Sequence, residues 1–136
     1  MKDKNKINKT SWKQIPTSLK FVFVLSIIWI IGTFFAIPIK FQQGLPFFGM
    51  YLFGISVIPI MLFLDIIGPI IFLIGTLKRK LWAVKIATIY ILIFVLNTIV
   101  ALFTVREQFG IIPLSIPAIV YTVFLYVIIK NKNYYK

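Results

Sequence analysis

Apolar residues fall into long runs, separated by short stretches that are polar or rich in glycine and proline. The four runs span about residues 21–39, 50–77, 81–105 and 109–129. A helix crossing the ~30 Å hydrocarbon core at ~1.5 Å per residue needs about 20 apolar residues, which each run supplies. The pattern therefore predicts four transmembrane helices. Because the connections are short, consecutive helices are expected to be antiparallel neighbours, which gives an all-α, up-down-up-down bundle over residues 19–130.

The stretch between the first two runs, FQQGLPFFG at residues 41–49, contains two glycines and a proline, which interrupt helices. We expect it to form an external loop at the membrane interface, with its phenylalanines and Tyr51 in the aromatic belt. A re-entrant hairpin over residues 41–50 is the alternative. The second run is long for one crossing, so a tilt or a kink is expected, the kink at Pro59 or at Pro69.

Composition agrees with a membrane protein. Hydrophobic residues make up 60% of the 136 residues and charged residues 13%, whereas a soluble domain carries about a quarter charged residues. The mean hydropathy is +0.99. Water would not solvate such a surface, so the chain is predicted to be an integral, multi-pass membrane protein.

The cations are distributed unevenly along the chain. All but two of the 15 lysines and arginines lie before the first run, around the second connection or after the fourth run; the exceptions are Lys40 and Arg106. The positive-inside rule therefore predicts both termini in the cytoplasm and places the protein in the cell membrane. The basic segments 1–18 and 131–136 are then cytoplasmic. The expected contacts are with lipid headgroups rather than nucleic acid, through Lys20, Lys78, Arg79, Lys80 and Lys130.

The residue types needed for most catalytic sites are missing. The chain has no cysteine and no histidine, and its only carboxylates are Asp3, Asp65 and Glu107. This excludes thiolate nucleophiles, disulfides, zinc fingers and iron–sulfur clusters, and it leaves too few carboxylates for a bridged metal centre. We expect no cofactor, no metal and no self-contained enzymatic activity.

Asp65 is the one acid inside an apolar run. It lies about 20 Å from Lys78 along a helix, near the membrane midplane, where an aspartate costs roughly 2.5–3.5 kcal/mol. Such a side chain is expected to face protein or water, with Tyr90 and Asn97 of the third run at similar depth. Three interpretations stay open: hydrogen-bonded packing with Asn97, contact with a cationic or donor group of another subunit, or binding of a proton, cation or cationic substrate during transport.

Small residues mark expected helix contacts, because they let backbones approach closely. Gly32 and Ala36 form a small-xxx-small pair in the first run. Gly54 and Gly68 share one face with Asp65 in the second. We expect all four small residues at helix–helix packing positions.

Three functions fit these features. The first is a small accessory subunit that packs against other integral membrane subunits and lipids in a larger complex. The second is an independent homo-oligomeric transporter or channel that uses the mid-membrane carboxylate. The third is a membrane protein that confers resistance or immunity by blocking another protein. The sequence favours the accessory subunit by elimination, since it has no nucleotide loop, ligand set or nucleophile.

Overall fold

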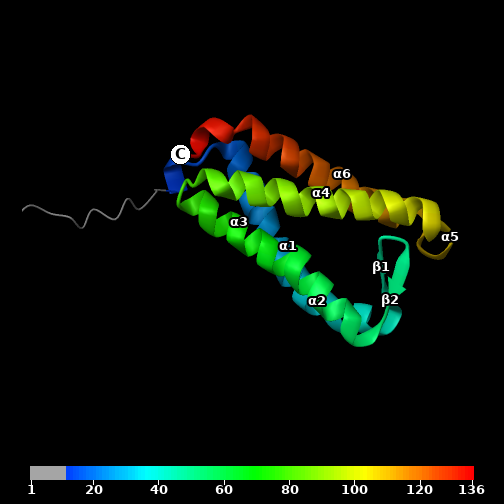
Figure 1. Ribbon diagram of the computed structural model, residues 1–136. Coiled ribbons are helices and arrows are strands. Elements are labelled where there is room, and N and C mark those ends of the chain that lie inside the picture. The colour runs from blue at the N-terminus through cyan, green and yellow to red at the C-terminus, as the bar shows by residue number, and fades with distance from the viewer. Residues whose placement is uncertain (1–11) are drawn as a thin grey trace, which may run out of the picture.

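The computed structural model describes residues 12–136 and is mostly helical (Figure 1). Four helical segments are long and apolar enough to cross a membrane: Thr17–Gln43, Gly54–Leu77, Leu81–Thr104 and Ile111–Lys130. They confirm the predicted all-α membrane protein with four helices of spanning length. Residues 1–11, which hold most of the basic segment predicted at 1–18, lie outside the described residues.

The first segment is one continuous helix, α1 (Thr17–Gln43), which is longer at both ends than the predicted 21–39. It begins directly after Pro16, whose carbonyl accepts a backbone hydrogen bond of the first turn (2.9 Å). It ends at Gly44, whose φ of 86° lies in the left-handed region that favours glycine. Because the helix continues through Lys40, that cation is part of the helix rather than of the following loop.

The second segment contains a π-helical turn, which is wider than a turn of an α-helix. It consists of a 3₁₀ turn (Gly54–Ser56), α2 (Val57–Met61), a π-helical turn (Leu62–Ile67) and α3 (Gly68–Leu77). Pro69 explains the wide turn, since it has no N–H to donate and in a regular α-helix its ring would press against the carbonyl of Asp65. The Gly68 N–H donates instead to the Phe63 carbonyl, five residues back. In place of the kink expected near Pro69, the helix has a π-helical turn with one extra residue, and Asp65 lies in this turn.

The second half of the chain is a helical hairpin of α4 (Leu81–Thr104), a single turn α5 (Arg106–Phe109) and α6 (Ile111–Lys130). Gly110 ends α5 with a φ of 78°. Pro113 lies in the first turn of α6, where its missing N–H costs no helical hydrogen bond. These bounds differ by one or two residues from the predicted runs at 81–105 and 109–129.

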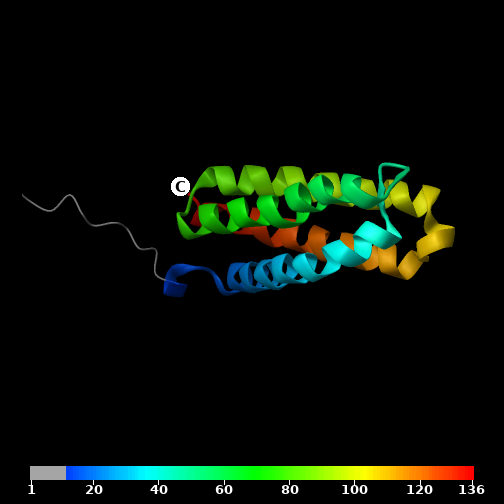
Figure 2. The same ribbon diagram turned by 90° about the horizontal axis from the view of Figure 1, so that it is seen from below.

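The helices form two arms that converge at one end (Figure 1). One arm is α1 with α2–α3, the other α4 with α6; Figure 2 shows α1 and α2–α3 in front of α4 and α6. The first described residues and the C-terminal residue lie together at the closed end. The most completely buried side chains come mainly from this half of the helices: Leu19, Val22, Phe72, Ala83, Ala87, Ile91 and Ile128. The core therefore fills the closed end, and the arms diverge toward the other end.

Two glycines allow α3 to approach α4 closely. A Cβ placed on Gly75 would lie 2.5 Å from the Ala83 Cβ and 2.9 Å from the Trp82 ring. A Cβ placed on Gly68 would lie 3.1 Å from the Tyr90 ring. The contact at Gly68 agrees with the expected packing role, whereas sequence analysis did not single out Gly75.

The last six residues fold back onto the turn between α3 and α4. The Tyr134 hydroxyl donates to the Thr76 carbonyl (3.1 Å), and the Tyr135 and Thr76 hydroxyls share a hydrogen bond (3.1 Å). The Arg79 guanidinium donates to the Tyr134 carbonyl and lies 4.9 Å from its ring centre. Burial raises the pKa of Tyr135 to about 12, so its phenol is neutral. The segment 131–136, expected as a basic tail, is a packed part of the fold.

A β-hairpin replaces the loop expected after α1. Strands β1 (Leu45–Phe47) and β2 (Met50–Leu52) pair antiparallel, and their turn contains Gly49 with a φ of 81°. Residues 50–52, which were expected to begin the second helix, are therefore strand, and the helical segment starts at Gly54. The hairpin crosses the open end of the bundle from α1 toward α4 (Figure 1).

Candidate functional site

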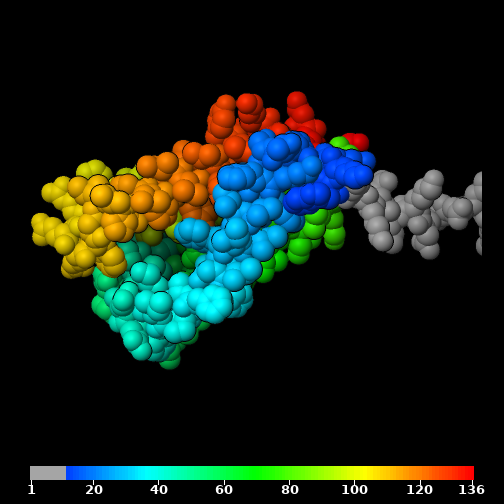
Figure 3. All heavy atoms as spheres, turned by 180° about the vertical axis from the view of Figure 1, so that it is seen from behind, coloured from blue at the N-terminus to red at the C-terminus, as the bar shows by residue number. Residues whose placement is uncertain are grey.

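A cavity of about 600 Å³ lies between the diverging arms. Residues of α1, α2, the π-helical turn, α4, α6 and β1 line it. Figure 3 shows the molecule hollowed on the face where α1 (blue to cyan) and α6 (orange) separate. Most of the lining is aliphatic or aromatic, and its two charged residues are Asp65 and Lys40.

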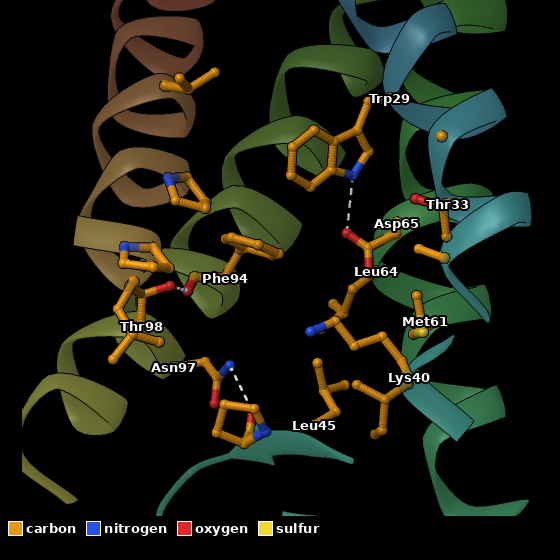
Figure 4. A pocket seen from close by; sticks show the side chains of 18 of the residues that line it. Trp29, Thr33, Lys40, Leu45, Met61, Leu64, Asp65, Phe94, Asn97 and Thr98 are labelled. Atoms are coloured by element: carbon orange, nitrogen blue, oxygen red, sulfur yellow. Dashed lines mark hydrogen bonds between the residues drawn. The ribbon is translucent and has the colours of Figure 1, made fainter. Parts of the chain in front are cut away.

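Asp65 is held by a tryptophan of α1. The Trp29 indole N–H donates to the Asp65 carboxylate (Nε1–Oδ1 3.0 Å), and Asp65 is 8% exposed (Figure 4). Within residues 12–136, the carboxylate accepts no second hydrogen bond and forms no ion pair. Asp65 also lines the cavity. The second carboxylate oxygen of Asp65 therefore has no hydrogen-bond donor among residues 12–136.

Aromatic rings fix the orientation of this indole. The Trp29 ring packs edge-on against Tyr121 (centroids 5.2 Å apart) and against Phe94 (6.1 Å). Phe94 and Tyr121 themselves lie 4.2 Å apart. Edge-to-face pairs of this kind add roughly 0.5–1.5 kcal/mol beyond their buried area. The hydrogen-bond donor to Asp65 is therefore held in place by α4 and α6 as well as by its own helix.

Lys40 brings a cation into the same cavity. Its side chain extends between Asp65 and Asn97 (Figure 4), and its ammonium lies 5.8 Å from the centre of the Phe109 ring on the opposite wall. It forms no ion pair with Asp65. The first predicted helix ends at residue 39 and leaves Lys40 in a connection, so an acid and an ammonium that line the same cavity are not expected from the sequence.

A sequence signal for Lys40 exists in the spacing of α1. Trp29, Thr33, Ala36 and Lys40 follow one another at intervals of four, three and four residues, which places them on one helical face. All four line the cavity. Had the helix been extended to Lys40, this face would have predicted that the lysine and the tryptophan point the same way.

Asn97 anchors the hairpin rather than meeting Asp65. Its carbonyl oxygen accepts from the Phe48 N–H (2.7 Å), and its amide nitrogen donates to the Pro46 carbonyl (3.2 Å; Figure 4). Both bonds go to the backbone of the hairpin. Asn97 lies about two turns before the end of α4, so the hairpin reaches into the bundle and forms one end of the cavity.

The other residues expected near Asp65 lie elsewhere. Tyr90 is 6% exposed and packs against Gly68 outside the cavity lining. Gly32 and Ala36 line the cavity, and a Cβ on Gly32 would meet no atom within 4 Å. Gly54 has a φ of 59° in the 3₁₀ turn, and a Cβ placed there would lie 3.9 Å from the Phe41 ring of α1. Of the three glycines expected at helix packing positions, Gly68 lies closest to a neighbouring helix.

The residues expected at lipid headgroups all lie at the closed end: Lys20, Lys78, Arg79, Lys80 and Lys130. Two of the lysines lie over aromatic rings at 5.8 Å, Lys20 over Trp12 and Lys130 over Tyr126. The Arg79 guanidinium contacts Tyr134, through its carbonyl and its ring. Cations and aromatic side chains therefore share this end of the molecule.

Asp65 is the one carboxylate among the described residues that line the cavity. Among the described residues, no group of three or more carboxylate, histidine or cysteine side chains could hold a metal ion. The Asp65 carboxylate and the Lys40 ammonium, in walls that are mostly apolar, would orient a molecule with an apolar body and a polar end. No protein family, no curated protein and no solved structure matches this chain.

Proposed function

We propose that the protein binds an amphiphilic molecule inside the membrane and serves in its transport. The observation that carries this proposal is that Asp65 and Lys40 both line a mostly apolar cavity of about 600 Å³. The ligand would have an apolar body that fills the walls. Its polar end would present a hydrogen-bond donor to Asp65 and an acceptor or negative charge to Lys40.

The energetics of Asp65 support a ligand. Placing this side chain at mid-membrane costs roughly 2.5–3.5 kcal/mol, and one indole N–H is its only protein donor among residues 12–136. A hydrogen bond to a charged group contributes about 1.5–3 kcal/mol. A ligand that donates to the free carboxylate oxygen would recover much of the cost.

The proposed orientation is an up-down-up-down bundle with both termini in the cytoplasm of the cell membrane. It is supported by the concentration of cations at the closed end and the positive-inside rule. The hairpin and the wide end of the cavity would then lie toward the outer face. The gap between α1 and α6 would let a molecule enter from the lipid.

A second candidate is a small accessory subunit of a larger membrane complex. Gly32 and Ala36 on α1 favour it, because both line the cavity and a Cβ on Gly32 would meet no described atom within 4 Å. Small-residue notches are preferred contact points for membrane helices, so a helix of another subunit would fit there. In both candidates the role is non-enzymatic.

The first prediction concerns the two charged groups of the cavity. Protein extracted in detergent-free membrane discs is expected to carry a small amphiphile that is detected by mass spectrometry. Asp65→Asn and Lys40→Gln should each reduce its bound fraction, with affinity falling roughly 10-fold to 100-fold, as expected for the loss of a charged hydrogen bond. Glu107→Gln and Lys78→Gln each remove a charge of the same sign outside the cavity, and both variants should retain the amphiphile.

The same preparation separates the two candidates. A chain alone or in a homo-oligomer, with a bound amphiphile, supports transport. Stoichiometric foreign chains, with no small molecule beyond bulk lipid, would reject the transport proposal in favour of the accessory subunit. Equal loss of the amphiphile from cavity variants and controls would also contradict it.

A further inference from the structure

A second groove lies at the closed end, on the outside of the bundle. It has a volume of about 450 Å³ and is lined by Leu81, Val84, Lys85, Thr88, Ile89, Ile129 and Lys132. These residues come from the start of α4, the end of α6 and the short turn that follows α6. The groove is separate from the cavity that contains Asp65, and the two share no lining residue.

Two lysines, one threonine and four aliphatic side chains line this groove. Lys85 and Lys132 are both exposed, and their long side chains can carry the ammonium groups to the level of lipid headgroups. Below them the wall is formed by leucine, valine and isoleucine. The groove therefore offers positive charge at its rim and an apolar surface along its length.

No acidic side chain of the described chain balances these lysines. The side-chain carboxylates among residues 12–136 are Asp65, in the cavity, and Glu107, at the opposite end of α4. With no acidic side chain of residues 12–136 in the groove, its two lysines favour an anion. The aliphatic wall favours an anion that carries hydrocarbon.

We infer that this groove binds a single anionic phospholipid. Its phosphate lies between Lys85 and Lys132, and one acyl chain follows the apolar wall between α4 and α6. Basic pockets between transmembrane helices on the cytoplasmic side are known to take anionic headgroups. The site is independent of the proposed transport function.

The test compares anionic with zwitterionic lipid on the full chain. Detergent-purified protein is titrated with phosphatidylglycerol or phosphatidylcholine, and bound lipid is counted by native mass spectrometry. One phosphatidylglycerol is expected to bind in preference to phosphatidylcholine. The double variant Lys85→Gln/Lys132→Gln should bind it roughly 30-fold more weakly, since each lysine near anionic lipid contributes about 1 kcal/mol.

The matched control is Lys78→Gln/Lys80→Gln, which removes two cations of the same end from outside the groove. It should weaken binding less than about threefold, and all variants should keep the unfolding temperature of the parent. Glycerol phosphate, which lacks acyl chains, should not displace the lipid at millimolar concentration. Equal weakening in the control, equal retention of phosphatidylcholine, or displacement by glycerol phosphate would each overturn the inference.

Discussion

Gly75→Val is expected to lower the free energy of unfolding by about 3 kcal/mol, the upper part of the range for overpacked cores. Even a Cβ at this position would lie 2.5 Å from the Ala83 Cβ. That atom is attached directly to the backbone of α4 and has no rotamer to change. Valine would therefore push α3 and α4 apart where the core is most completely buried.

The control for this change is Gly32→Val. Both glycines lie inside long helices, but a Cβ on Gly32 meets nothing within 4 Å. Both variants gain similar helix propensity, so their difference isolates the α3–α4 contact. Reversible unfolding in mixed detergent micelles measures the two free energies. If Gly75→Val were as stable as Gly32→Val, the close approach of α3 and α4 would be refuted.

Tyr135→Ala should likewise destabilise the protein by about 3 kcal/mol, as aromatic-to-alanine changes do in cores. Tyr135 is 5% exposed, packs edge-on against Tyr134 (5.2 Å) and shares a hydrogen bond with Thr76. Tyr135→Phe keeps the ring and loses only the hydroxyl, so it should cost about 1 kcal/mol. The two substitutions separate ring packing from hydrogen bonding.

Tyr126→Ala provides the comparison for the tail. Tyr126 is an exposed tyrosine (63%) near the same end of α6, and its loss should change stability by no more than about 0.5 kcal/mol. Thermal unfolding of the three variants, with proteolysis of the tail as a second readout, tests the assignment. A Tyr135→Ala protein as stable as Tyr126→Ala would mean that the last six residues do not pack against the α3–α4 turn.

The four helices follow from the sequence because hydrocarbon imposes one simple requirement on length and polarity. The hairpin does not. Its strands have three residues each and are too short for an alternating pattern. The hairpin is anchored by the Asn97 side chain, which forms hydrogen bonds with backbone atoms of residues 46 and 48. The pattern of side chains along a sequence does not indicate which backbone atoms a side chain will bond to.

The environment of Asp65 was predictable in part. The expected position near the membrane midplane, and the free-energy cost of an aspartate there, predict a side chain that faces protein or water. In the structure, the Asp65 side chain is buried and lines the cavity between the helices. Its donor was sought on the third helix at matching depth, whereas Trp29 belongs to the first. The π-helical turn changes which way residues 62–67 point relative to a regular helix, so a helical-wheel argument fails at this segment.

The position of Lys40 depended on where α1 ends. A charged residue normally marks the end of a membrane span, and that rule placed the boundary at residue 39. The helix instead continues to Gln43, where Gly44 ends it. Because α1 extends four residues beyond the predicted end, Lys40 belongs to the helix and lines the cavity instead of flanking the membrane span.

The wide turn at Leu62–Ile67 also has a consequence for recognising relatives. It holds one residue more than a regular helix needs, and each residue of an α-helix turns the chain by about 100°. A homologue shorter by this single residue would keep the buried closed end, yet its acid would point in another direction. A one-residue gap at this place in an alignment would therefore separate proteins that share only the scaffold from proteins that also share the direction of the carboxylate, even where the aspartate itself is retained.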